Sequence, residues 1–154
     1  MKKIKLTKGY EAIVDDKDFD FLNQWKWYFA HGYAVRTQNN YPNKPFQVRM
    51  HRIILGTPEG MDSDHINRDR LDNRRSNLRI CNRSQNISNT FLRSNKSGYK
   101  GVSWKKSNNK WVAQITVFGK TLHLGIYSDP KEAAKVYNQA AQKHHGEFAV
   151  LNSI

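Results

Sequence analysis

The chain has 154 residues, 38% hydrophobic and 12% aromatic, which is enough for one compact domain or two small ones. Its 26 Lys and Arg exceed its 13 Asp and Glu, and the net charge of +13 indicates a polyanionic partner rather than an acidic small molecule alone. The aromatic content excludes a disordered basic tail. The single cysteine, Cys81, excludes an internal disulfide framework and a zinc finger built on two or more thiolates.

No stretch of about 18 apolar residues occurs, and no apolar signal core follows Met1-Lys2-Lys3. We therefore expect no membrane or export step, and a reducing cytoplasm as the location. The excess positive charge is +4 over residues 1–60, +3 over residues 61–94 and +6 over residues 95–154. The middle block uses only Arg and the last block only Lys, which indicates a linker near the polar residues 93–98.

The first block predicts short strands and one short helix. Residues 10–14 are a strand candidate, and the three aspartates among residues 15–18 favour the start of a helix. Residues 27–30 and 33–36, joined by His31-Gly32, predict a hairpin. Core packing is the favoured interpretation over base stacking for three aromatic residues, Trp25, Trp27 and Tyr33.

The middle block is rich in Asn, Asp and Arg. Residues 62–66 predict a short strand, residues 67–77 an irregular loop and residues 78–81 a second strand. Asn82 can cap a following helix whose third position is Gln85. The expected order is strand, loop, strand, helix.

The last block has the clearest pattern. Residues 99–104, 110–117 and 120–127 predict three antiparallel strands, and a helix opens at Asp129-Pro130 and closes at Gly146. The small residues of that helix let it lie close against one sheet face, where Trp111 is expected to be core. The other face stays free and carries Lys110, Val112, Gln114 and Thr116.

Asp64, His65 and Asn86 carry the strongest chemical signal. If the two middle strands pair and the helix packs across them, the Asp64 carboxylate and the Asn86 carboxamide can converge on one hard cation such as Mg²⁺. Such a cation would stabilise charge on a scissile phosphate, and neutral His65 could accept a proton from the attacking water. The alternative is that Asp64 and His65 form a local turn hydrogen bond.

Residues 49–90 resemble the HNH nucleases, particularly the homing endonucleases of phages and introns. The matching segments are residues 50–55 (MHRIIL), 64–67 (DHIN), 71–74 (LDNR) and 76–79 (SNLR). The resemblance implies a ββα-metal site in which Asp64 and Asn86 bind a divalent metal, most readily Mg²⁺ with Mn²⁺ as the alternative. It also implies that His65 is the general base and that Asn77 braces the loop.

One position departs from the family pattern, because Asn86 stands where the family name places a helix His; the same substitution occurs in the phage homing branch. His51 is either a support of the site or an ordinary structural residue. Arg79 and Arg83 are either phosphate contacts or solvated charges. Cys81 has no base near it in the sequence and is expected to be buried structure.

Residues 98–152 resemble the DNA-binding domain of the plant APETALA and ethylene-response factors, which also occurs fused to HNH nucleases of mobile elements. The match includes residues 98–102 (GYKGV), 110–115 (KWVAQI), 122–125 (LHLG) and 149–152 (AVLN). That family lays its free sheet face in the major groove of DNA.

The resemblance implies a set of DNA contacts. At these positions the chain has other residues than the Arg and Trp of the plant domains, so the plant target sequence does not transfer. On and beside the reading face we expect Lys100, Ser103, Lys105, Gln114, Thr116, Thr121 and His123, with Lys106 and Lys120 as phosphate contacts at the turns.

The sequence thus predicts an α+β protein with an N-terminal β-rich region (1–48), a ββα-metal motif (49–92), a linker (93–98) and a three-stranded sheet packed on one helix (99–154). The predicted function is that of a metal-dependent, homing-type endonuclease on double-stranded DNA, cutting one strand and needing no protein partner. Two rivals are a sequence-specific DNA-binding repressor with an inactive nuclease site and an RNA-binding protein.

Overall fold

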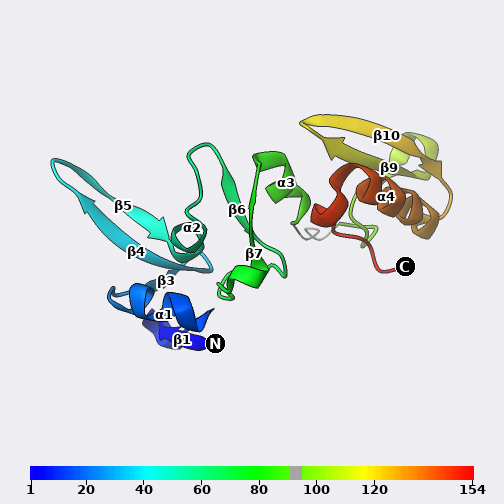
Figure 1. Ribbon diagram of the computed structural model, residues 1–154. Helices are drawn as coiled ribbons and strands as arrows, with labels where there is room; N and C mark the ends of the chain where they lie inside the picture. The colour runs from blue at the N-terminus through cyan, green and yellow to red at the C-terminus, as the bar shows by residue number, and fades with distance from the viewer. Residues whose placement is uncertain (91–94) are drawn as a thin grey trace. The chain divides into compact units, whose positions relative to one another are not determined.

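The computed structural model describes residues 1–90 and 95–154 (Figure 1). The chain is α+β and forms two compact units, Met1–Asn82 and Arg83–Ile154. Part of the expected linker, residues 93 and 94, lies outside the described residues. Within the described part of the chain, every helix is too short or too polar to span a bilayer.

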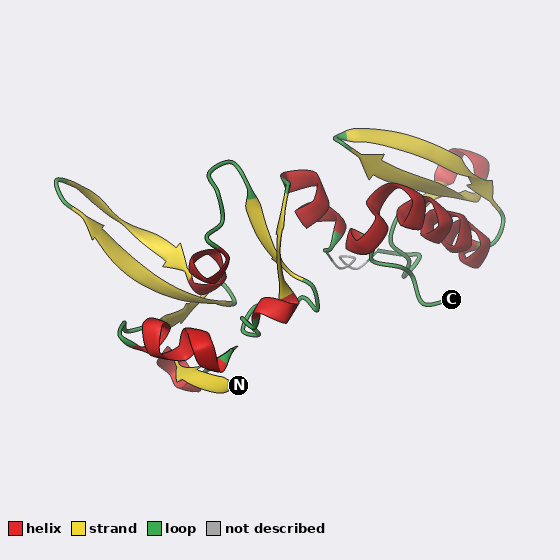
Figure 2. Cartoon of the chain, in the orientation of Figure 1, coloured by secondary structure: helices red, strands yellow, loops and turns green. Residues whose placement is uncertain are grey.

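The first unit combines three small sheets with two short helices (Figure 2). The element bounds are β1 Lys2–Lys5, β2 Glu11–Val14, α1 Asp16–Asn23, β3 Tyr28–Ala30, β4 Tyr33–Asn40, β5 Asn43–Arg49, α2 Met50–Leu55, β6 Asp62–His65 and β7 Leu78–Cys81. The strand pairings, β1 with β2, β3 with β4, β4 with β5, and β6 with β7, are all antiparallel. The expected β2, β3–β4 hairpin, β6 and β7 are all present.

One hydrophobic core serves this unit. It contains side chains of β1, β2, α1, α2 and β7, among them Ile4, Val14, Leu22, Met50 and Leu78. Trp27 is buried, as expected, and its indole Nε1 donates to the carbonyl of Leu22 at 2.8 Å. Trp25 packs at the edge of the same core.

Two elements of the first unit differ from the sequence expectation. Strand β4 continues to Asn40, well beyond residue 36, and forms a second, longer hairpin with β5 that the sequence did not predict. The apolar run of residues 50–55 forms α2, whose C-cap Gly56 adopts the left-handed conformation at φ 57°. This helix turns His51 toward the middle of the unit.

The second unit opens with α3 Arg83–Ser88 and continues with β8 Val102–Lys105, β9 Lys110–Val117, β10 Lys120–Tyr127 and α4 Pro130–His145. The sheet order is β10-β9-β8, all antiparallel, which confirms the predicted meander. Strand β8 begins three residues later than expected. The side chains of Asn95 and Ser97 bond to the carbonyls of Tyr99 and Val102 and hold that stretch in a turn.

Helix α4 covers one face of this sheet through small residues. Asp129 caps it by accepting from the amide of Lys131, and Gly146 ends it, as predicted. Ala133 and Ala134 pack on Val102 and Ala113, and Tyr137 packs on Ile115. Alanines let the helix approach this face closely. In the described part of this unit, α4 is the helix that packs on the sheet, and it leaves the second face uncovered.

Candidate functional site

The β6–β7 pair positions Asp64 and His65. Asp64 lies opposite Arg79 in the ladder, and His65 lies opposite Leu78. Both side chains are buried, with Asp64 7% exposed and His65 4% exposed. Neighbouring strand residues point to opposite faces, so the carboxylate and the imidazole leave β6 on different sides.

Asp64 is held by a guanidinium from the facing strand. Arg79 donates from Nε at 3.0 Å and from Nη2 at 2.9 Å to the same oxygen, Oδ2 of Asp64. The Arg79 side chain is only 11% exposed, so the pair is largely withdrawn from water. The phosphate contact suggested for Arg79 stays a prediction, while the structure gives this side chain a partner in Asp64.

His65 is fixed by a buried carboxamide. Its Nε2 lies 3.2 Å from Oδ1 of Asn73, a residue that is fully buried. Asn73 is itself held, because its amide donates to the carbonyl of Ile13 and its Nδ2 donates to the carbonyl of Leu71. Burial lowers the pKa of His65, although the Asn73 hydrogen bond and the charge of Asp64 act in the opposite direction. The imidazole is therefore neutral at pH 7.

The loop between β6 and β7 is braced by side chains rather than by regular structure. Asn77 accepts from the amide of Asn67 at 2.9 Å and donates to the carbonyl of Asp72 at 2.8 Å. Asp72 binds the Arg74 guanidinium at 2.6 and 2.7 Å, and this partner holds the pKa of Asp72 below its usual value. These contacts fix the loop that carries Asn73.

A second histidine lies beside the first. His51 of α2 is 3% exposed, and its ring centroid is 4.7 Å from that of His65. The Tyr33 ring lies 5.3 Å from His51 and 6.1 Å from His65. Burial, reinforced by the charges of His65 and nearby arginines, lowers the pKa of His51 to about 3. Tyr33 and Asn73 are the two neighbours of His65 that sequence reasoning did not assign to the site.

Asn86 and Arg83 lie on α3, which belongs to the second unit. Their approach to Asp64 therefore stays a prediction. Within residues 1–90 and 95–154, no group of three or more His, Cys, Asp or Glu side chains is placed to hold a metal ion. The donors predicted here are one carboxylate and one carboxamide, which are oxygen ligands of the kind that Mg²⁺ accepts together with water and phosphate.

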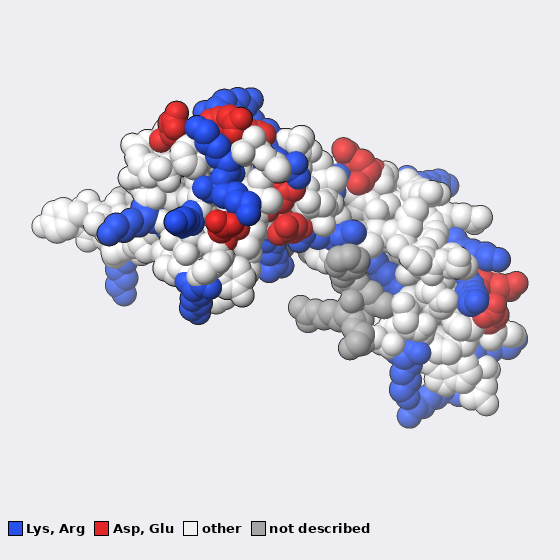
Figure 3. Space-filling model, turned by 90° about the horizontal axis from the view of Figure 1, so that it is seen from below, with Lys and Arg blue, Asp and Glu red and all other residues white. Residues whose placement is uncertain are grey.

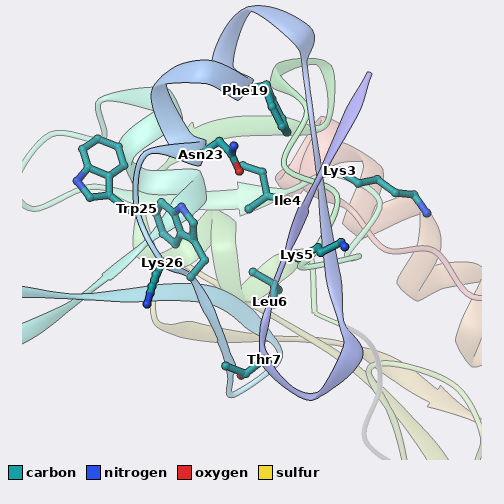
Figure 4. Close-up of a pocket in the computed structure, with 10 residues that line it drawn as sticks. Lys3, Ile4, Lys5, Leu6, Thr7, Phe19, Asn23, Trp25 and Lys26 are labelled. Atoms are coloured by element: carbon teal, nitrogen blue, oxygen red, sulfur yellow. The ribbon is translucent and has the colours of Figure 1, made fainter.

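Cys81 and a pocket beside β1 lie outside the group of residues around His65. Cys81 is buried, and burial raises the pKa of its thiol to about 11, which makes it a structural residue. A pocket of about 550 Å³ lies beside β1, with Phe19, Trp25 and Lys26 on its wall (Figure 4). The described residues that line it include no carboxylate, imidazole or thiol.

The uncovered sheet face of the second unit carries most of the expected DNA contacts. Strand register places Thr116 beside Thr121, with their hydroxyl oxygens 3.2 Å apart, and Gln114 beside His123. All four are exposed. The same face also carries Ser103, Lys105 and Lys110, which are exposed, and Val112, which is only 9% exposed because it lies between two neighbouring strands.

The three other lysines expected to contact DNA differ in their surroundings. Lys106 and Lys120 are exposed at the two turns of the sheet. Lys100 instead precedes β8, and its ammonium donates to the carbonyls of Ser88 at 2.6 Å and Thr90 at 2.8 Å, just after α3. The position of Lys100 therefore suits a helix C-terminus, where a cation is favourable.

Comparisons with known proteins add to this geometry. Residues 48–87 match the HNH endonuclease family, and residues 97–147 match the AP2 domain. The chain is 30% identical over 154 residues to an uncharacterized HNH endonuclease of Acanthamoeba polyphaga mimivirus, an alignment covering 96% of this chain and 77% of the relative.

Two further relatives match separate parts. Protein 3.8 of Escherichia phage T7 is 32% identical over 93 residues, covering 60% of this chain and 76% of the phage protein. An AP2-like ethylene-responsive transcription factor of Arabidopsis thaliana is 45% identical over 58 residues, covering 36% of this chain and 17% of the plant protein. No solved structure matches.

Proposed function

Because the chain belongs to the HNH endonuclease family and carries an AP2 domain, we propose that it is a metal-dependent DNA endonuclease that hydrolyses a phosphodiester bond. The observation that carries this proposal is the Asp64-His65 pair at the end of β6. Its carboxylate is buried beside an arginine, and its neutral imidazole is held by Asn73. Such an arrangement combines a candidate ligand with a candidate base.

His65 is the proposed general base. A neutral imidazole has one N–H, and with Nε2 donating to Asn73 the lone pair lies on Nδ1. Nδ1 can then take a proton from the attacking water. Burial of the ring favours the neutral form that this step requires.

Asp64 and Asn86 are the proposed ligands of the divalent ion, Mg²⁺ or Mn²⁺. When bound, the ion would stabilise negative charge on the scissile phosphate. The Arg79 guanidinium balances the Asp64 charge inside the protein and helps to orient the carboxylate, because two of its N–H groups donate to Oδ2. Asn77 keeps the loop between the strands in place through its two backbone hydrogen bonds.

The uncovered face of the β8–β9–β10 sheet is the proposed major-groove reader. Its exposed Gln114, Thr116, Thr121 and His123 can bond to base edges, and lysines at its margin can bind phosphates. The chain has one HNH motif, which acts on one phosphodiester at a time. We therefore expect a homing-type enzyme that nicks one strand of its site.

Cleavage and binding must be measured separately to test this proposal. Asp64→Asn and Asn86→Ala each weaken one proposed ligand, so nicking should need far more Mg²⁺ while metal-free DNA binding persists. Unchanged Mg²⁺ dependence in both variants would place the ligands elsewhere. A wild-type protein that binds DNA but never cuts would support the rival repressor, and preference for RNA in competition would support an RNA-binding protein.

A further inference from the structure

The β4–β5 hairpin extends well beyond the core of the first unit. From Thr37 to Gln47 every residue is exposed, and the two strands project away from α1 and α2 (Figure 1). Only the base of the hairpin, through Ala34, joins the hydrophobic core. A two-stranded ribbon gains little stability by itself, so its length is not explained by folding of the unit. Its dimensions do suit the major groove, which admits a two-stranded ribbon.

The segment that contains the hairpin has basic residues and no acidic ones. No Asp or Glu occurs from residue 21 to residue 58, a stretch that includes Arg36, Lys44 and Arg49. On the face drawn in Figure 3, the outer end of the hairpin shows neutral and basic atoms only. Three other arginines of the unit are neutralised, since Arg74, Arg75 and Arg79 each pair with an aspartate. The hairpin therefore keeps a positive field suited to a polyanion.

Strand alternation separates two faces of the hairpin. The ladder pairs Val35 with Arg49 and Thr37 with Gln47, so Thr37, Gln47 and Arg49 share one face with Tyr33. Gln38 pairs with Phe46 and lies on the opposite face with Arg36. That opposite face turns toward the unit, because the Arg36 guanidinium lies 4.5 Å from the Trp25 ring and donates to Gln38 at 3.0 Å.

The face that carries Thr37, Gln47 and Arg49 also carries Tyr33, which adjoins His65. The guanidinium carbons of Arg49 and Arg70 each lie 4.6 Å from the centroid of the Tyr33 ring. Among the described residues, neither guanidinium lies within 4.0 Å of a carboxylate. The Tyr33 ring in turn adjoins the ring of His65. Two cations without a carboxylate partner among the described residues therefore lie against Tyr33, whose ring adjoins that of the proposed base.

We propose that the hairpin face formed by Thr37, Gln47 and Arg49 is a second surface for duplex DNA, beside the phosphate presented to His65. Arg49, which like Arg70 lies against the Tyr33 ring, contacts backbone phosphate, which fixes the register of the duplex. Gln47 and Thr37 lie toward the groove, where a carboxamide can bond to a base edge. This inference rests on the proposed function for its orientation toward His65, but the DNA contact itself does not require cleavage.

A matched pair of charge changes tests which face meets DNA. Gln47→Glu and Gln38→Glu each add one negative charge to the same hairpin, on opposite faces, in the full chain. Binding to a short mixed-sequence duplex is measured without divalent metal at about 0.15 M salt, where screening acts over about 8 Å. We expect Gln47→Glu to weaken binding roughly tenfold and Gln38→Glu less than twofold. Equal effects of the two variants, or none from either, would overturn the proposal.

A second pair of variants tests the phosphate contact. It still tests the proposal if a variant of the first pair fails to fold. Arg49→Gln should lower the slope of log affinity against log salt by about 0.9, the share of one duplex phosphate contact. Lys17→Gln, an equal charge loss at an exposed position on α1, should leave the slope unchanged. Identical slopes in both variants would contradict the proposal.

Nicking of plasmid by the wild-type chain is scored in parallel. Failure of the wild type to cut would count against the nuclease proposal alone. Unchanged binding by Gln47→Glu and Arg49→Gln in a chain that cuts would count against the hairpin surface alone.

Discussion

Arg79 and Asp64 face each other across the β6–β7 ladder, and two N–H groups of the guanidinium donate to one carboxylate oxygen, at 3.0 and 2.9 Å. The carboxylate that is proposed to bind metal is thus already paired with a cation of the protein. Removing one partner of a buried ion pair leaves an uncompensated charge. The pair therefore links the stability of the unit to the occupancy of the proposed metal site.

Arg79→Gln should lower the free energy of unfolding by about 3 kcal/mol in metal-free buffer, because the Asp64 charge loses its buried partner. Mg²⁺ should restore more stability to this variant than it adds to the wild type, since the freed carboxylate can bind the ion. Urea unfolding with and without Mg²⁺ measures both effects. Arg75→Gln, which breaks the more exposed Arg75–Asp18 pair, is the control and should not gain from Mg²⁺. An equal Mg²⁺ effect in all three proteins would contradict the link.

Asn73 should act as a positioning residue for His65. Asn73→Ala removes the acceptor of the Nε2 proton and should slow cleavage by roughly tenfold or more, with DNA affinity nearly unchanged. Asn73→Asp keeps an acceptor oxygen and should retain more activity than Asn73→Ala. If both variants lose activity in proportion to a loss of folded protein, seen by circular dichroism, the role of Asn73 is structural only.

The folding stability of the first unit should fall in acid because of His51. Above pH 6.5 this histidine is neutral in both folded and unfolded chains, so its contribution to stability is fully present. Below pH 6.5 the unfolded chain binds a proton that the folded chain excludes down to about pH 3. The loss is about 1.4 kcal/mol for each pH unit in this window. Urea unfolding between pH 7 and pH 4.5 measures the free energy of unfolding against pH. For His51→Phe this free energy should fall less steeply in acid than for the wild type, and the difference in slope should correspond to about one bound proton.

A control for that experiment is His123→Phe, which replaces an exposed histidine of the second unit. It should leave the acid dependence of unfolding as in the wild type. If His51→Phe and His123→Phe behave alike, the acid sensitivity comes from other groups.

Gly101 should be irreplaceable in the second unit. Its φ is +75°, and a Cβ there would lie 2.0 Å from the Tyr137 ring and 2.7 Å from the carbonyl oxygen of Gln114. Gly101→Ala should cost about 3 kcal/mol or more, because backbone strain adds to overpacking. Gly98→Ala has a similar φ, +72°, but open space around it, and should cost only about 1 kcal/mol. Equal shifts of the urea midpoint in the two variants would contradict the close packing of α4 on the sheet.

The second unit was predictable because its signals are local. The alternation of residues 110–117, the turn at Phe118-Gly119 and the Asp129-Pro130 cap each specify their own element. The prediction gives both β9 and β10 their observed bounds. Strand β8 was placed too early because the Asn95 and Ser97 bonds that shape the preceding turn depend on side-chain geometry.

The first unit was less predictable because its key features depend on pairing between distant residues. Residues 43–49 include Pro45 and alternate between apolar and polar only from Phe46 to Arg49, so the strand signal is short and β5 depends on its ladder with β4. The apolar residues 50–55 suit a strand as well as the short helix α2 that they form. The sequence suggested Asp64 and His65 as a pair. The contact of Asp64 with Arg79 follows from strand register, which a twelve-residue connecting loop does not specify.

The proposed reaction is measured itself when nicking of supercoiled plasmid is compared between wild-type protein and His65→Ala, each with Mg²⁺. We expect the wild type to convert supercoiled plasmid to the open circle, chelation of Mg²⁺ to stop the reaction, and His65→Ala to cut at least roughly 10²-fold more slowly. Binding of duplex DNA by His65→Ala should match the wild type, because the substitution removes no positive charge. Equal nicking rates for the two proteins would contradict the proposed role of His65. No nicking by the wild type at any Mg²⁺ concentration would contradict the proposed nuclease activity.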